Sequence, residues 1–191
     1  MDKGYIAPET ALKKLRTARS LGQTVYIYGA TGYGKTELVK QYLKNRKYWY
    51  VSCGEDTAVL TTLAEDAPSG MPNSRKENRK GKKTKNVSRT VIVLDDVQLL
   101  KNVPGRRAAL AIVGREDIWL ILICRSPLPS WLMPPYMRSG FIVITEDDLC
   151  FGEKEIAAYM EAQGIPLTEK ELATVCRNCR GNAYAVRHTA L

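Results

Sequence analysis

The chain has 191 residues, a formal net charge of +9 and five cysteines. This length suits one α/β domain of about 150 residues with a small appendage. The sequence holds no apolar run near the roughly 18 residues that a membrane span needs, and its first residues lack the apolar core of a signal peptide. An odd number of dispersed cysteines does not fit a secreted disulfide framework, so we expect a cytoplasmic protein without a membrane partner.

The first predicted element is an amphipathic helix at residues 8–22. Pro8 suits its first turn, Gly22 ends it, and Leu12 and Leu15 lie on its apolar side. This pattern predicts a helix that packs on the rest of the domain through one face.

The central motif lies between an apolar strand at residues 25–28 and a helical run at 37–43. Its pattern is G-x-x-x-x-G-K-T, read from Gly29 to Thr36. Glycines allow positive φ and a close approach of the backbone to an anion, so successive N–H groups can surround phosphate oxygens. The N-terminus of the following helix adds partial positive charge. The predicted phosphate-binding loop, or P-loop, consists of Gly29, Ala30, Thr31, Gly32, Tyr33, Gly34, Lys35 and Thr36.

Two side chains of the P-loop carry predicted chemistry. Lys35 would reach the β- and γ-phosphates of a nucleotide, and the Thr36 hydroxyl would ligate Mg²⁺. The expected cofactors are therefore ATP or ADP with magnesium. Tyr5 and Ile6, which precede the first helix, are candidate neighbours of the base, with simple packing as the other interpretation. For the whole loop, the alternative is a glycine-rich β–α turn that binds no ligand.

A strongly basic segment follows a second strand at residues 47–53 and a helix at 56–64. Eight basic residues and one acidic residue lie between positions 75 and 89, which leaves a net charge of +7. Residues 65–89 hold almost no large apolar side chain, so we expect a mobile basic insertion that cannot offset its ordering entropy. It could contact nucleic acid or an acidic partner, although no aromatic residue interleaves the charges for base stacking. A solvated loop is the alternative.

A third predicted strand, residues 90–94, ends in two aspartates. Asp95 and Asp96 follow its apolar run, at the carboxyl end where parallel sheets bind ligands. Asp95 is predicted to bind Mg²⁺ together with Thr36, and Asp96 to orient or deprotonate the attacking water. The alternative is that the two aspartates cap the next helix.

Arg125 stands at the carboxyl end of the fourth predicted strand, residues 118–124, which follows a helix at 104–115. In that place its guanidinium can contact a γ-phosphate and act as a sensor. Pairing with Asp95 or Asp96 in the nucleotide-free protein is the alternative. The candidate catalytic residues are therefore Lys35, Asp96 and Arg125.

The last part of the chain changes from strands to helices. The predicted elements are an irregular, proline-rich connection at residues 127–135, a strand at 141–144, and helices at 152–163, 168–175 and from 182 onward. Thr168 and Glu171 form a capping box for the second of these helices. Tyr184, Val186 and Leu191 give the last helix an apolar side that it cannot bury alone, so we expect the chain to be part of a longer protein.

The cysteines favour packing over metal binding. Cys176 and Cys179 have a C-x-x-C spacing, but a structural zinc needs four ligands and His188 is the only histidine. Two thiols on one helical face are the expected arrangement, with a metal site as the alternative. Cys53 and Cys124 lie at the ends of predicted strands, where buried free thiols are common.

Four segments, in this order, resemble the nucleotide-binding domain of STAND-type signalling ATPases, and within them the large ATP-binding LuxR-type transcription regulators related to the maltose-regulon activator. Residues 32–36 are similar to that family's G-Y-G-K-T loop and residues 93–100 to its strand with paired aspartates. Residues 122–126 resemble its sensor-arginine strand, and residues 144–151 the segment that leads into a helical lid. Ala183 stands where the family usually carries a proline against the base.

The resemblance implies a P-loop NTPase of the α/β class. Its five-stranded parallel sheet, in the order 5-1-4-3-2, would lie between helices in a core at residues 1–145. A small C-terminal helical lid would occupy residues 146–191.

The function implied by the resemblance is an ATP/ADP-binding switch with weak, magnesium-dependent ATPase activity. Such a module would regulate a multidomain signalling or transcription protein, self-associate in its ATP state and reach DNA through domains that this chain lacks. Asp96 is shorter than a glutamate, which suits slow turnover. One alternative is a nucleic-acid-dependent AAA+-like ATPase that uses the basic residues 75–89. Another is a nucleotide-stabilised interaction module that does not hydrolyse ATP.

Overall fold

The computed structural model describes residues 6–54, 57–65 and 89–190. The predicted basic insertion therefore lies outside the described residues, except for its two end positions, Glu65 and Arg89. Across the described ranges, no helix combines the length and the apolar character that crossing a membrane requires.

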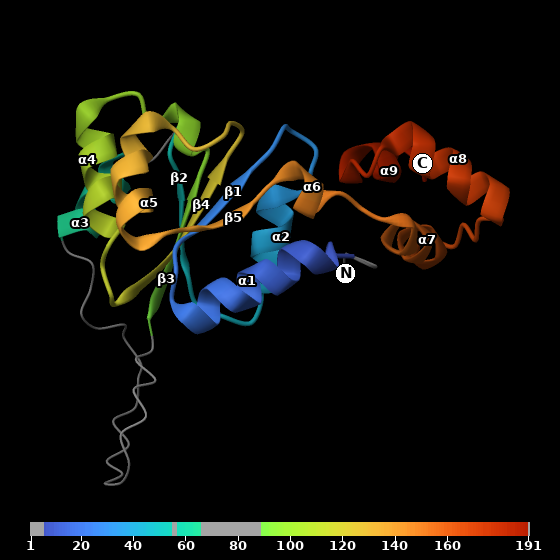
Figure 1. The fold of residues 1–191 in the computed structure, drawn as a ribbon, viewed down its shortest axis with the longest axis horizontal. Coiled ribbons are helices and arrows are strands. Elements are labelled where there is room, and N and C mark those ends of the chain that lie inside the picture. The colour runs from blue at the N-terminus through green and yellow to red at the C-terminus, as the bar shows by residue number, and fades with distance from the viewer. Residues whose placement is uncertain (1–5, 55–56, 66–88, 191) are drawn as a thin grey trace, which may run out of the picture.

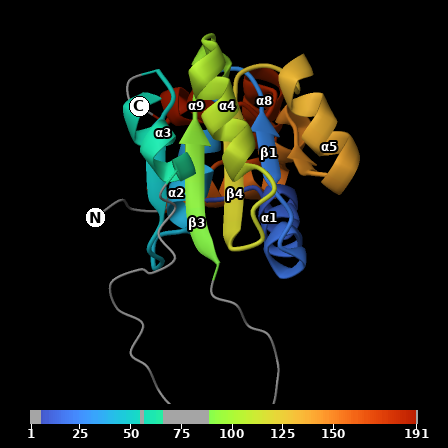
Figure 2. The same cartoon turned by 90° about the vertical axis from the view of Figure 1, so that its left-hand side faces the viewer.

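The described residues form one five-stranded sheet in which every pair of neighbouring strands is parallel. Its strands are β1 (Val25–Tyr28), β2 (Trp49–Ser52), β3 (Thr90–Asp95), β4 (Ile118–Cys124) and β5 (Ile142–Ile144). They lie in the order β2-β3-β4-β1-β5 (Figures 1 and 2), which confirms the predicted order 5-1-4-3-2. Because β1, β3 and β4 are central and parallel, their carboxyl ends bring together the segments that follow each strand.

Helices cover both faces of the sheet (Figure 1). On one face lie α1 (Glu9–Leu21) and α2 (Lys35–Tyr42), and on the other lie α3 (Thr57–Glu65), α4 (Val103–Ile112) and α5 (Met133–Ser139). All seven residues of the strand β4 are buried, which requires helices packed on both faces of the sheet. Leu120 and Leu122 pack with the α3 and α4 face, whereas Ile121 and Ile123 pack with the α1 and α2 face. Such a continuous apolar run is typical of a central parallel strand.

One predicted connection and the end of one predicted helix are wrong. A 3-10 turn at Ser130–Leu132 and the helix α5 stand where residues 127–135 were expected to be irregular. Pro134 and Pro135 lie in the first turn of α5, where a missing backbone N–H leaves no intrahelical hydrogen bond unmade. The helix expected at residues 168–175 continues to Cys179 as α8 (Glu169–Cys179).

The C-terminal helices form a group beside the sheet that follows the short helix α6 (Glu146–Leu149) (Figure 1). They are α7 (Glu153–Ala162), α8 and α9 (Ala183–Thr189), and they share a hydrophobic cluster of their own. Each helix contributes buried side chains to this cluster, among them Met160 of α7, Val175 of α8 and Val186 of α9. The predicted capping box is confirmed, because the Thr168 N–H donates to the Glu171 carboxylate at 2.8 Å and the Glu171 N–H donates to Thr168 Oγ1 at 3.4 Å.

Candidate nucleotide-binding site

The P-loop connects the end of β1 to the start of α2 at the carboxyl edge of the sheet. Gly32 and Gly34 have φ values of 95° and 72°, which favour glycine. Gly32 also lies close to α9, since a Cβ on it would come within 3.1 Å of the Tyr184 Cβ. The Tyr33 ring packs against the hydrophobic cluster of α1 and α2. The backbone of this loop thus has the positive-φ turns that a phosphate-binding loop needs.

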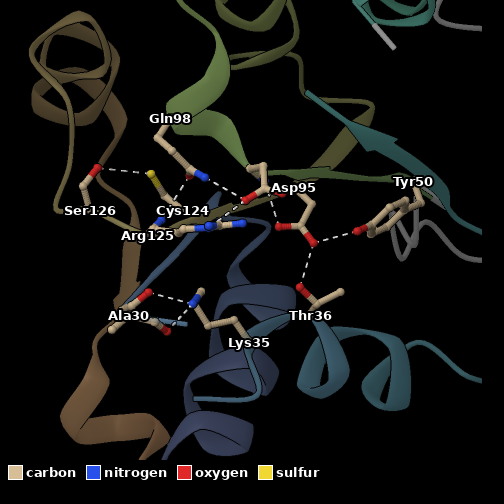
Figure 3. A network of polar contacts seen from close by, with 11 residues as sticks. Ala30, Lys35, Thr36, Tyr50, Asp95, Gln98, Cys124, Arg125 and Ser126 are labelled. Atoms are coloured by element: carbon tan, nitrogen blue, oxygen red, sulfur yellow. Dashed lines mark hydrogen bonds and ion pairs between the residues drawn. The ribbon is translucent and has the colours of Figure 1, made fainter. Parts of the chain in front are cut away.

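Lys35 is the first residue of α2, and its side chain is only 8% exposed. Its Nζ donates to the carbonyl oxygens of Gly29 at 2.6 Å and Ala30 at 2.7 Å (Figure 3). Burial lowers the pKa of Lys35, and the nearby Asp95 carboxylate opposes that shift. The ammonium group is therefore held inside the loop, where a phosphate anion would favour its charged form.

Asp95 is buried at the end of β3, and its carboxylate accepts three hydrogen bonds (Figure 3). Its Oδ2 accepts from Thr36 Oγ1 at 2.7 Å and from the Tyr50 hydroxyl at 2.6 Å, and its Oδ1 accepts from the Asp96 N–H at 2.8 Å. Because Thr36 directs its proton at Asp95, the lone pairs of Oγ1 stay available to a cation. A hydroxyl and a carboxylate are hard oxygen ligands, so this pair fits magnesium.

Arg125 and Asp96 form an ion pair beside this carboxylate. Arg125 Nε lies 3.2 Å from Asp96 Oδ1, and Gln98 Nε2 donates to the same oxygen at 2.7 Å. Gln98 Oε1 also accepts from the Arg125 N–H at 3.1 Å, so its amide joins both residues (Figure 3). The sequence left open that Arg125 pairs with Asp95 or Asp96, and in the structure it pairs with Asp96. The Arg125 side chain is 57% exposed, and an exposed pair of this kind opens at a cost of about 1 kcal/mol or less.

A cavity of about 790 Å³ joins these residues to the C-terminal helices. The core side of its lining includes Thr31, Gly32, Gly34, Lys35, Thr36, Asp95, Asp96 and Arg125, together with Ile6 from before α1. The opposite side includes Phe151, Tyr159, Ala183, Tyr184 and Arg187. Ala183 faces the P-loop, because its Cβ lies 3.8 Å from where a Cβ on Gly34 would be. The volume is in the range of small-molecule sites, which are about 300–1,000 Å³.

Glu146 is a P-loop contact that the sequence did not reveal. Its carboxylate accepts a hydrogen bond from the Ala30 N–H, and a Cβ on Gly29 would meet the Glu146 Cγ at 2.6 Å. The prediction had instead counted the Ala30 N–H among the phosphate-binding groups. The contact follows from sheet order, since β5 pairs with β1 with Ile27 opposite Ile144, two residues before Glu146. The predicted strand order already placed β5 beside β1, but the contact also needs the register of that pair, which the sequence did not provide.

We expect Glu146→Ala to lower the free energy of unfolding by about 0.5–1.5 kcal/mol, the net contribution of a typical hydrogen bond, because Ala30 is exposed and water can replace the lost acceptor. Glu146→Gln should lose less, because its amide oxygen can still accept from Ala30. Denaturant unfolding monitored by circular dichroism measures both. Asp147→Ala is the matched control, since Asp147 is exposed on the same helix. Equal losses in Glu146→Ala and Asp147→Ala would contradict a specific anchor.

The cysteines lie as packing residues would. Cys53 and Cys124 are buried in the sheet's core, as expected, and burial raises the pKa of the Cys53 thiol to about 12. Cys179 is buried among the C-terminal helices with its sulfur 3.4 Å from Thr189 Oγ1, and Cys176 lies on the same helix. The described part of the chain contains no group of three or more residues that could hold a metal through histidine, cysteine or carboxylate ligands.

Comparison with known proteins gives matches only among solved structures, since neither a family model nor a curated protein matches this sequence. A Walker-type ATPase of Pyrococcus abyssi aligns with a TM-score of 0.61 and 13% identity over 95% of this chain and 66% of that chain. A STAND protein with a tetratricopeptide repeat sensor from Pyrococcus horikoshii aligns with a TM-score of 0.58 and 16% identity over 94% of this chain and 28% of that chain.

A third similar structure is the RuvB Holliday junction branch migration motor of Thermotoga maritima. It aligns with a TM-score of 0.54 and 16% identity over 95% of this chain and 58% of that chain. This chain thus spans from about a quarter to just under two thirds of the length of these proteins. Identities this low establish the fold alone, and the chain has the fold of the P-loop NTPases.

Proposed function

We propose that this chain is an ATP/ADP-binding switch module with weak, magnesium-dependent ATPase activity. The observation that carries the proposal is the two-sided lining of the 790 Å³ cavity. The P-loop and the residues Asp95, Asp96 and Arg125 line it from the sheet, while α7 and α9 line it from the other side. A nucleotide bound there would contact both parts and thereby couple their relative positions.

Each core residue has a distinct role in this proposal. Lys35 neutralises phosphate charge, and Thr36 and Asp95 hold magnesium, which supplies further electrostatic stabilisation of the phosphates when bound. Asp96 orients the attacking water and accepts its proton. Arg125 leaves Asp96 and contacts the γ-phosphate. This one movement frees the Asp96 carboxylate to act as the base and brings the Arg125 guanidinium to the phosphate. The exposure of the Arg125 side chain supports this order of events, because an exposed pair is easily broken.

The switch would act through the C-terminal helices, which we propose to be a lid at residues 146–191. The Tyr184 N–H donates to the Gly32 carbonyl at 3.0 Å, which joins α9 directly to the P-loop. Exchange of ADP for ATP would shift the lid only by the difference in affinity of the two nucleotides for its two positions. A lid that contacts the P-loop directly would respond to whether the bound nucleotide is ADP or ATP.

The proposed context is a longer, multidomain signalling or transcription protein located in the cytoplasm. The support is the likeness to a STAND protein that carries a repeat sensor and of which this chain covers only 28%. In that context the ATP state would self-associate, and contact with DNA would be made by other domains. These partners are proposals that rest on the fold and on the sequence resemblance.

The experiment that tests the proposal is to denature the purified protein and identify any released nucleotide by chromatography. We expect ADP approaching one molecule per chain, with phosphate release from added ATP that is slow and requires magnesium. Protein that carries no nucleotide and binds neither ATP nor ADP at millimolar concentration, with or without magnesium, would overturn the proposal. Retained nucleotide with no phosphate release at all would favour the non-hydrolysing interaction module.

A nucleic-acid-dependent ATPase is a second candidate, because residues 75–89 carry a net charge of +7. In that case, turnover would rise when single-stranded DNA or RNA is added, and the rise would vanish steeply with salt. Deleting residues 75–89 would remove the stimulation. The same phosphate-release assay, run with and without nucleic acid, separates the two candidates.

A further inference from the structure

Tyr50 connects the edge of the sheet to the centre of the site. It lies on the edge strand β2, opposite Val93 of β3, so its side chain extends along the same face as Asp95, two residues further on. Its hydroxyl donates to Asp95 Oδ2 at 2.6 Å (Figure 3). From the other side, Lys40 of α2 places its ammonium 5.4 Å from the centre of the Tyr50 ring. The ring is therefore held between α2 and the carboxylate.

The hydroxyl of Tyr50 determines how the Asp95 carboxylate is oriented. Oδ2 accepts two O–H groups, from Tyr50 and Thr36, which uses both of its lone pairs. Oδ1 accepts the Asp96 N–H. With donors on both oxygens, rotation of the carboxylate would break hydrogen bonds that the buried group cannot replace with water.

We propose that Tyr50 is a positioning residue for the magnesium site: it occupies Oδ2 together with Thr36 and so leaves Oδ1, which has one lone pair to spare, as the oxygen of Asp95 that can bind the metal beside Thr36. The inference rests on the proposed function and adds a residue to it. Groups that hydrogen-bond to metal ligands fix the ligand's direction, and their loss typically weakens metal affinity by about 10- to 100-fold. Without the Tyr50 hydroxyl, Thr36 alone restrains Oδ2, and Asp95 can turn away from the position that binds the cation.

The test uses Tyr50→Phe, which keeps the ring and its packing and removes only the hydroxyl. The first measurement is the affinity for ADP in EDTA, and the second is the affinity of the ADP-loaded protein for Mn²⁺, followed by electron paramagnetic resonance. We expect Tyr50→Phe to bind ADP in EDTA within about two-fold of wild type and to bind Mn²⁺ about 10-fold more weakly. Magnesium titration of ADP binding should show the same shift.

Tyr42→Phe is the matched control, because it removes the same hydroxyl from a tyrosine of α2 whose ring packs against Trp119, with ring centres 6.1 Å apart; Tyr42 is less exposed than Tyr50. It should leave both affinities unchanged. Unaltered Mn²⁺ affinity in Tyr50→Phe overturns the inference, and so does an equal loss of ADP affinity with and without metal, which would indicate a merely structural role. Wild-type protein that binds no nucleotide at all would overturn the proposed function, and this inference with it.

Discussion

Lys35→Ala is expected to abolish nucleotide binding, with an affinity for ATP and ADP about 100-fold or more below that of wild type. Lys35 is only 8% exposed, and its ammonium group donates to two carbonyl oxygens of the P-loop, where its attraction to phosphate is screened little. Removing one partner of a buried, hydrogen-bonded charge pair costs about 2–5 kcal/mol, and 2.7 kcal/mol already corresponds to about 100-fold. The remaining backbone N–H groups cannot replace a full charge.

The measurement is isothermal titration calorimetry with ADP and ATP in the presence of magnesium. Lys44→Ala is the matched control, because Lys44 is exposed just beyond the end of α2. Thermal unfolding must accompany the titration, since Lys35 also bonds to two carbonyl oxygens of the loop. A folded Lys35→Ala protein that binds ADP like wild type would refute the assignment of the P-loop as the nucleotide site.

Much of this fold was predictable because its central strands β1, β3 and β4 are buried on both faces. A central parallel strand is a continuous apolar run, and the residue after it lies at the ligand-binding edge. That rule found Asp95 at the end of β3 and Arg125 directly after β4, and the structure brings both to the cavity beside the P-loop. Their proposed roles in catalysis remain predictions, because position at an edge does not itself define chemistry.

The parts that sequence reasoning missed are contacts between segments that lie far apart in the chain. Glu146 is 116 positions from Ala30, and Tyr50 is 45 positions from Asp95. Neither contact has a local pattern, since each depends on which strands are neighbours and on their register. The helix α5 was missed for a different reason. Its prolines suggested an irregular connection, whereas prolines in a first helical turn are tolerated.

These two missed contacts have a common consequence for the site. Glu146 anchors the start of the P-loop to the segment after the edge strand β5, and Tyr50 anchors Asp95 to the opposite edge strand, β2. The proposed phosphate-binding and metal-binding parts of the site are thus each supported from an outer strand. A preorganised site of this kind needs less reorganisation when a ligand binds.

Asp96→Asn is expected to retain ATP binding and to lose about 100-fold or more of the turnover rate, since a positioned general base contributes about 10²–10⁴-fold. Asparagine keeps the size of the side chain and its hydrogen-bonding oxygen, but its amide cannot take a proton from water. Loss of the ion pair with Arg125 should change stability little, because the Arg125 side chain is more than half exposed. Single-turnover phosphate release and ATP titration measure the two effects separately.

The matched control for this prediction is Asp117→Asn, which makes the same change in an exposed aspartate that pairs with Arg115 at 2.8 Å. It should hydrolyse ATP at the wild-type rate. Asp96→Asn that also hydrolyses at this rate would show that Asp96 is not the base, and the pair with Arg125 would then be a structural contact. Loss of ATP binding in Asp96→Asn would make Asp96 a binding residue instead. Retained binding with lost turnover is the one combination that a water-positioning carboxylate explains.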